Sequence, residues 1–217
     1  TTFSDLVQEA RERIKRDAIA AGLPDDNQPL AQAGSGTTAY ADAVGVYLGL
    51  GVSRLSDAQN ALCQWGPSAD QTQHLFRRQA VPMVWDFAES SMFSGAAGDL
   101  VTSVGSLCRV LEKFNPVVVG GSTQNAAQGQ EVSENKVIST DPPYYDNIGY
   151  ADLSDFFYVW LRRCLRPIFP KLYATLAVPK AEELVATPYR HGGKAQAETF
   201  FLDGMTAALH NLARQAH

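Results

Sequence analysis

The segment of the chain best suited to chemistry is Asp141-Pro142-Pro143-Tyr144, which follows a short β-branched run at 136–140. Pro142 fixes its own φ and favours an extended conformation for Asp141. Because neither proline carries an N–H, the segment presents carbonyl oxygens and a carboxylate without competing donors. Such acceptors suit a group with two N–H donors, such as an exocyclic amino group, and the tyrosine offers a flat surface for stacking. The pattern indicates either a ligand-binding loop or simply a rigid turn.

The elements before residue 115 are predicted to be helical. Apolar residues recur every three or four positions over 4–21, and similar patterns predict helices over 40–62 and 98–114. The second helix contains Gly45, Gly49 and Gly51, each of which costs about 1 kcal/mol relative to Ala. We therefore expect a neighbouring element to approach this helix closely. The dense apolar segment at 81–93 is expected to lie in the core.

After residue 115, the sequence patterns predict strands as well as helices. Short β-branched runs at 117–119 and 136–140 each predict a strand, and apolar periodicity predicts helices over 152–166 and 195–215. Two strands among many helices predict an α/β fold whose sheet continues outside this sequence. In open sheets of this class, ligands bind at the carboxyl ends of the strands. Asp141 comes directly after the predicted strand at 136–140, so it is expected at such an end. We expect two regions, a helical one over 1–115 and one over 116–217 that carries the loop.

Composition and charge narrow the class of protein. The chain is 45% hydrophobic and carries a net charge of −5, which indicates a globular protein that does not bind DNA with its whole surface. A local basic surface is still compatible with this charge. Its candidate residues either follow a nucleic-acid backbone or form a solvated helix end that matches the helix dipole; they are Arg162, Arg163, Arg166 and Lys171. No apolar run approaches the roughly 20 residues that span a bilayer.

The cysteines bear on the compartment and on metal binding. Cys63, Cys108 and Cys164 lie far apart and form no C-x-x-C pair. This spacing argues against a disulfide framework and against a zinc cluster, so we expect no metal site. It also favours a reducing, cytoplasmic location.

The loop sequence resembles a known family. Asp-Pro-Pro-Tyr after a strand resembles the catalytic motif of the amino-group DNA methyltransferases, which transfer a methyl group from S-adenosylmethionine to adenine N6 or cytosine N4. The longer block at 140–163 resembles the large adenine-specific DNA methylases of prokaryotes that contain a zinc-ribbon insertion, as do residues 78–89 and 188–194. The resemblance covers most of the chain from about residue 40. It implies an incomplete, helix-rich Rossmann-like methyltransferase domain with a helical N-terminal annex.

The resemblance also implies roles for individual residues. Asp141 and the carbonyl of Pro142 would accept hydrogen bonds from the target amino group, and Tyr144 would stack on a base flipped from the duplex. With Pro143, these residues form the expected catalytic loop. The expected substrate contacts are Tyr145, Asn147, Arg190 and Lys194, and the expected contacts to the cofactor, S-adenosylmethionine, are Gln124 and Asn125.

The sequence departs from the family in lacking the glycine-rich turn that holds the cofactor and in lacking the zinc ribbon. We therefore expect this chain to act with the remainder of a larger methyltransferase. The expected function is methylation of a DNA base, with adenine N6 as the first candidate. We expect the enzyme to be cytoplasmic, to have DNA as its partner and not to associate with a membrane. Methylation of RNA or of a protein amide, or a catalytically silent recognition module, are the alternatives. Asp rather than Asn at position 141 favours DNA.

Overall fold

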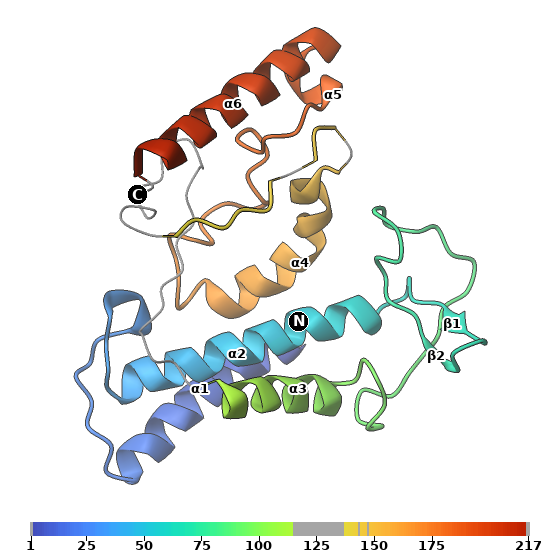
Figure 1. Ribbon diagram of the computed structural model, residues 1–217. Helices are drawn as coiled ribbons and strands as arrows, with labels where there is room; N and C mark the ends of the chain where they lie inside the picture. Colours follow the sequence, from blue (N-terminus) through green and yellow to red (C-terminus); the bar gives the residue numbers. More distant parts are fainter. Residues whose placement is uncertain (1, 115–136, 143, 147, 216–217) are drawn as a thin grey trace. The chain divides into compact units, whose positions relative to one another are not determined.

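The computed structural model of the chain describes residues 2–114, 137–142, 144–146 and 148–215 (Figure 1). These residues are mostly helical, with 53% in helices and 2% in strands. The helices are α1 (Thr2–Ala20), α2 (Thr37–Ala58), α3 (Leu100–Lys113), α4 (Tyr150–Leu165), α5 (Pro188–His191) and α6 (Lys194–Gln215), with a 3-10 turn, η1 (Leu30–Gln32). The strands β1 (Trp65–Gly66) and β2 (Gln71–Thr72) pair as an antiparallel hairpin.

The prediction of an α/β fold with an incomplete Rossmann-like domain is wrong. The described residues contain one two-stranded hairpin and no Rossmann-like sheet. Residues 137–142 form neither helix nor strand, although their β-branched character predicted a strand. Val137 is 100% exposed, so it lacks the packing surface on which the strand preference of β-branched residues depends. The other predicted strand, at 117–119, lies outside the described residues.

The chain divides into two compact units. Unit 1 comprises Thr1–Pro116 and Asp155–Ala177, and unit 2 comprises Val117–Ser154 and Val178–His217. The boundary falls within α4, whose first residues belong to unit 2 and whose remainder belongs to unit 1. The loop of interest is therefore part of unit 2, together with α5 and α6.

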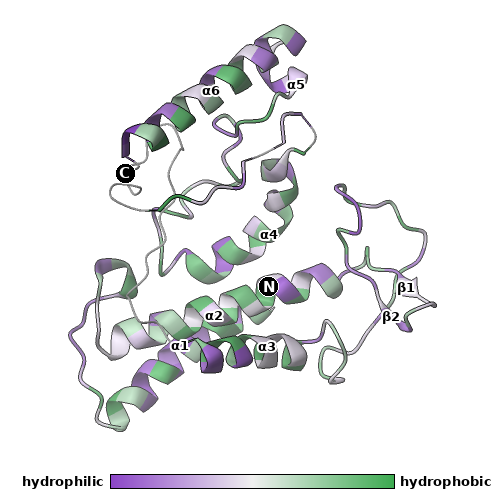
Figure 2. Ribbon diagram, in the orientation of Figure 1, coloured by the Kyte–Doolittle hydropathy of each residue, from purple (hydrophilic) through white to green (hydrophobic). Residues whose placement is uncertain are grey.

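The core of unit 1 forms where α4 and the segment after it meet the N-terminal helices. α1 and α3 both pack against α2. Polar and apolar residues alternate along α1 in Figure 2, as expected for a helix with one buried face. The buried cluster at the centre contains Val7, Val52, Cys164, Leu165, Ile168 and Tyr173. The helical periodicity of the sequence thus predicts this part of the structure well.

Gly49 confirms the expected close approach to α2. A Cβ atom at this position would lie 2.8 Å from Cδ2 of Leu165 and 3.1 Å from Cβ of Cys164. Only a glycine lets α4 pack this closely, which offsets the cost of a glycine inside a helix. The contact at Gly51 is looser, because a Cβ atom there would lie 3.6 Å from Cδ1 of Leu107.

A buried ion pair joins α1 to α2. Arg11 contacts Asp42 with Nη2 2.7 Å from Oδ1, and the side chain of Asp42 is 2% exposed. The second carboxylate oxygen of Asp42 accepts a hydrogen bond from the backbone N–H of Leu30 at 3.1 Å. Both oxygens of the buried carboxylate are therefore satisfied, as a charge inside a protein requires.

The prediction that residues 81–93 lie in the core is wrong. Residues 73–99 form neither helix nor strand, and Met83 and Trp85 are 91% and 99% exposed. Consecutive apolar residues outside a regular element point in different directions, so one packing surface cannot bury them all. This segment leaves large apolar side chains in contact with solvent.

None of the helices among the described residues has the length and apolar character that crossing a membrane requires.

Candidate functional site

The Asp-Pro-Pro-Tyr loop lies on the surface of unit 2. Asp141 and Pro142 are exposed, and they belong to an irregular segment. No ion pair involving Asp141 occurs among the described residues, so its carboxylate is accessible to a ligand. Pro143 and Asn147 lie outside the described residues. The expected role needs an accessible carboxylate beside an exposed proline, and Asp141 and Pro142 are both exposed.

The two adjacent tyrosines have different environments. Tyr144 is 64% exposed, which leaves its ring accessible. The ring of Tyr145 instead packs edge-on against Phe201 of α6, with centroids 5.1 Å apart and an interplanar angle of 87°. Burial raises the pKa of Tyr145, and a hydrogen bond with Glu198 raises it further. Tyr144 is therefore the tyrosine able to stack on a base, whereas Tyr145 anchors the loop to α6.

Backbone contacts hold the end of the loop in place. The carbonyl of Tyr145 accepts a hydrogen bond from the N–H of Ala186 at 2.8 Å. Ile148 is buried, three residues further along. The start of α4 is capped by Glu183, whose Oε1 accepts a hydrogen bond from the N–H of Ala151 at 2.9 Å. The acceptors at Asp141 and Pro142 are thus presented ahead of a fixed segment.

Arg190 of α5 binds both carboxylates near the start of α4. Its guanidinium donates to Glu183, with Nη1 2.6 Å from Oε2, and also to Asp152. The Tyr189 hydroxyl donates to the same oxygen of Asp152 at 2.8 Å. Burial opposes ionisation of Asp152, but the hydrogen bonds from Tyr189 and Arg190 outweigh it and lower the pKa of Asp152. Burial also opposes ionisation of Arg190, which by itself would lower its pKa. The hydrogen bonds with Glu183 and Asp152 outweigh burial, so the pKa of Arg190 is raised.

The two predicted basic substrate contacts are placed differently. Arg190 is 10% exposed, and its guanidinium is occupied by Asp152 and Glu183. Lys194 is 83% exposed and lies 3.9 Å from the carboxylate of Glu198 one turn along α6. The Lys194 ammonium can therefore reach an external phosphate, whereas the Arg190 guanidinium would first have to leave Asp152 and Glu183.

Sequence reasoning missed three residues that position the loop, namely Asp152, Glu183 and Phe201. Asp152 had a local explanation, because an acidic residue in the first turn of a helix matches the helix dipole. Glu183 and Phe201 lie 38 and 56 residues from Tyr145 in the numbering, and no local pattern connects them to it. Such long-range partners leave no signal in a single sequence.

The described residues around the loop do not show a fit for S-adenosylmethionine. The cofactor carries an ammonium group and ribose hydroxyls, which call for acidic acceptors. The carboxylates of Asp152 and Glu183 are already taken by Arg190. Gln124 and Asn125, the predicted cofactor contacts, lie outside the described residues. Among the described residues of unit 2, the exposed residues of the loop include Asp141, Pro142 and Tyr144.

The arrangement of the His, Cys, Asp and Glu side chains bears on metal binding and on thiol chemistry. Within the described ranges, no group of three His, Cys, Asp or Glu side chains could hold a metal ion. Cys63 and Cys164 are buried, and Cys108 is exposed; all three are free thiols. Burial raises the pKa of both buried thiols, which keeps them protonated and unreactive.

Two of the arginines near the end of α4 make contacts within unit 1. Arg162 donates through Nε to the carbonyl of Thr175 at 2.8 Å, and Arg163 lies 3.4 Å from the carboxylate of Asp5. These contacts favour the structural interpretation of the basic residues over a nucleic-acid stripe.

Comparisons with protein-family models, with curated proteins and with solved structures found no match. The functional interpretation depends on the loop residues themselves.

Proposed function

We propose that this chain presents the exocyclic amino group of a DNA base, adenine N6 in the first place, for methylation by S-adenosylmethionine. The observation that carries the proposal is the joint exposure of Asp141, Pro142 and Tyr144 on a loop whose following residues are anchored. The resemblance of residues 140–163 to the amino-group methyltransferases supports the same reading. We place the chain in the cytoplasm as part of a larger methyltransferase, consistent with its three free cysteines.

The chemistry follows from the acceptors that the loop offers. An exocyclic amino group carries two N–H donors, and the Asp141 carboxylate and the Pro142 carbonyl would accept one hydrogen bond each. These hydrogen bonds would favour a nitrogen lone pair that lies out of conjugation with the ring and is free to react. The negative charge of Asp141 stabilises the positive charge that develops on the nitrogen. S-adenosylmethionine supplies the methyl group when it is bound.

Tyr144 contributes to placing the base. An amino group that is paired within a duplex cannot reach the loop, so the base must first leave the stack. The exposed ring of Tyr144 offers an aromatic face that recovers part of the lost stacking energy, about 1–3 kcal/mol per base. The neighbouring Tyr145 cannot do so without leaving Phe201.

The test is transfer of a labelled methyl group to DNA by the full-length protein, compared with the Asp141→Ala variant. We expect the variant to lose at least about a hundredfold in rate, as when one oriented electrostatic contact is removed from an active site. Asp146→Ala is the matched control, because this exposed carboxylate lies on the same loop and has no assigned role. Full activity in Asp141→Ala would reject the proposal. The same assay with RNA in place of DNA decides between the two nucleic acids.

A second candidate is a catalytically silent recognition module. The mostly helical structure of the described residues favours it. Such a module would bind DNA but would transfer no methyl group, and Asp141→Ala would leave its affinity unchanged.

A further inference from the structure

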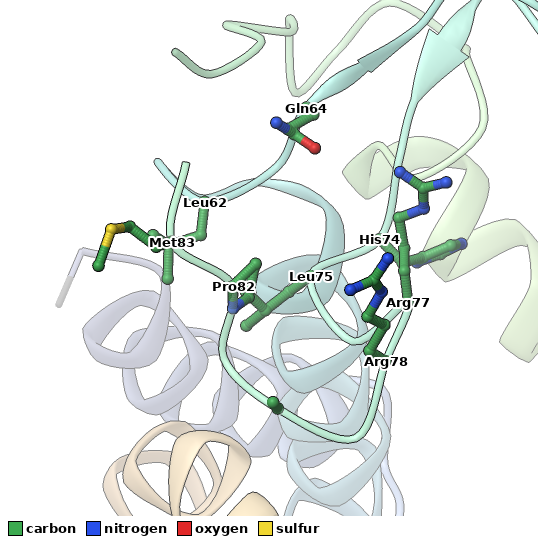
Figure 3. A pocket seen from close by; sticks show the side chains of 9 residues that line it. Leu62, Gln64, His74, Leu75, Arg77, Arg78, Pro82 and Met83 are labelled. Carbon is green, nitrogen blue, oxygen red and sulfur yellow. The ribbon is translucent and has the colours of Figure 1, made fainter. Parts of the chain in front are cut away.

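A cavity of about 410 Å³ opens on unit 1 next to the β1–β2 hairpin (Figure 3). Its walls come from residues just before β1 and from the irregular segment that follows β2. Pockets that bind small organic ligands have volumes of about 300–1,000 Å³. The cavity is therefore large enough for a nucleotide.

The cavity has a basic side and an apolar side. Figure 3 shows His74, Arg77 and Arg78 on one side and Leu62, Pro82 and Met83 on the other, with Gln64 between them. This lining suits a ligand that is anionic at one end and apolar or flat at the other. A nucleotide has this distribution, with its phosphate at one end and its base at the other.

The charges in the cavity favour an anion. Arg77 donates a hydrogen bond to the neutral amide of Gln73, and Arg78 has no hydrogen bond or ion pair within the part of the chain that the structure describes. The remaining basic group, His74, pairs with Asp57 at 2.9 Å. No carboxylate is among the residues that line the cavity. Two guanidinium groups thus remain able to bind one phosphate, which matches their planar geometry.

Two large apolar side chains, one on the apolar side and one close to it in the sequence, are exposed to solvent. Met83 is 91% exposed and Trp85, two residues further on, is 99% exposed. Aromatic side chains beside a basic groove are the usual surface for stacking the bases of a single nucleic-acid strand. The acidic residues of the same segment, Asp86 and Glu89, are outside the lining of the cavity.

We propose that this cavity binds one nucleotide, with the phosphate on Arg77 and Arg78 and the base against the side formed by Leu62, Pro82 and Met83. In a nucleic-acid strand, the next base would stack on Trp85. The site is separate from the Asp141 loop and is argued from its own residues; it shares with the proposed function only the nucleotide class of ligand.

The experiment measures binding of a short, fluorescein-labelled single-stranded DNA to the full chain by fluorescence anisotropy at several salt concentrations. We expect Arg77→Ala combined with Arg78→Ala to weaken binding about tenfold or more, since each lost contact is a charge-assisted hydrogen bond. The slope of log affinity against log salt should fall by about 0.7, because the two arginines bind the same phosphate and one phosphate contact is lost. Arg13→Ala is the control, because this arginine is 78% exposed on α1 and remote in sequence from the cavity.

The aromatic contact is tested on its own. Trp85→Ala should weaken binding of the strand about fivefold or more, and Trp85→Phe should retain most of the affinity. Replacement of Arg77 and Arg78 by Lys should keep the salt slope but lose affinity, because Lys keeps the charge without the planar pair of donors. Thermal melting checks that each variant folds; all three positions are exposed.

Two arms identify the source of the ligand. Displacement of the strand by AMP in an Arg77- and Arg78-dependent manner supports a free nucleotide as ligand, and binding of the strand alone supports a nucleic acid. The proposal is overturned if neither probe binds, or if the double alanine variant binds as tightly as Arg13→Ala. The two proposals are tested by different variants, since the Arg77 and Arg78 substitutions address the cavity and Asp141→Ala addresses the loop. If binding depends on the arginines but neither the parent protein nor any variant transfers a methyl group, the proposed function is rejected and the cavity proposal stands.

Discussion

The guanidinium of Arg190 donates a hydrogen bond to Glu183 across 2.6 Å, between Nη1 and Oε2. Arg190 also binds Asp152 in the first turn of α4, and Glu183 caps the same helix start through Ala151. One arginine side chain thus joins α5 to two segments that follow the Asp-Pro-Pro-Tyr loop. A residue that sequence reasoning assigned to the substrate has an internal role in unit 2.

Replacement of Arg190 should therefore affect stability first. We expect Arg190→Ala to lower the free energy of unfolding by about 2–3 kcal/mol, because Glu183 would stay buried without its partner while Asp152 remains partly in water. Arg190→Lys should lose less, since it keeps the charge. Urea denaturation followed by circular dichroism measures both. Unchanged stability in Arg190→Ala, with weaker DNA binding, would instead support a substrate contact.

The two tyrosines of the loop provide a matched pair. Tyr145→Ala should destabilise unit 2 by about 1 kcal/mol or more, because the edge-on contact with Phe201 is lost. Tyr144→Ala should change stability by less than about 0.5 kcal/mol, since this ring is 64% exposed. The methyl-transfer assay should show the opposite order, with the larger loss in Tyr144→Ala. Equal effects of the two variants on stability would contradict the different roles.

The buried carboxylate of Asp42 gives the largest expected stability effect in unit 1. Asp42→Ala should cost about 3–5 kcal/mol, because Arg11 and the N–H of Leu30 would both lose their acceptor. Asp17→Ala serves as the control, since its pair with Arg13 is exposed and should contribute less than about 1 kcal/mol. Chemical denaturation measures the difference. If Asp42→Ala lowers the free energy of unfolding by less than the control does, the ion pair of Asp42 does not hold α1 against α2.

Two glycines of α2 should respond in opposite directions to the same substitution. Gly49→Ala should destabilise the protein by about 1–3 kcal/mol, because the new methyl group would overlap Leu165. Gly51→Ala should stabilise it by up to about 1 kcal/mol, since its new contact with Leu107 is ordinary and alanine favours the helix. Thermal melting of the two variants tests the prediction. A stabilising Gly49→Ala would show that α4 does not pack this closely.

Stability should fall in acid for a specific reason. Hydrogen bonds from Ser35 and Gln28 lower the pKa of Asp26, and partial burial of Asp25 is outweighed by its hydrogen bonds from Thr38, which lower its pKa strongly. A lowered pKa means that the folded state favours the carboxylate, so its contribution is complete above the unfolded pKa of about 4. That contribution is lost as the pH falls below about 4 toward the folded pKa.

Unfolding midpoints measured from pH 7 down to pH 2 check this prediction. Asp25→Asn should be less stable than the parent at pH 7, and the difference should shrink as the pH falls. A difference that stays constant across this range would contradict a role for the Asp25 charge.

The positions of the long helices were determined by the sequence alone. Predicted helices at 4–21, 40–62, 98–114, 152–166 and 195–215 correspond to α1, α2, α3, α4 and α6 with shifts of a few residues at their ends. Apolar periodicity is a local property, so one sequence is enough to show it. The loop chemistry is local in the same way, because two prolines remove donors wherever the chain places them.

The tertiary structure alone decided what those local patterns could not. The run at 136–140 had strand-forming residues but no described neighbour on which to pair, and Met83 and Trp85 had core-like side chains but no surface to cover them. Arg190 binds Asp152 and Glu183, and Tyr145 packs on Phe201, through contacts between residues far apart in the sequence. A strand, a buried residue and an ion pair each need a partner, and only the folded chain supplies it.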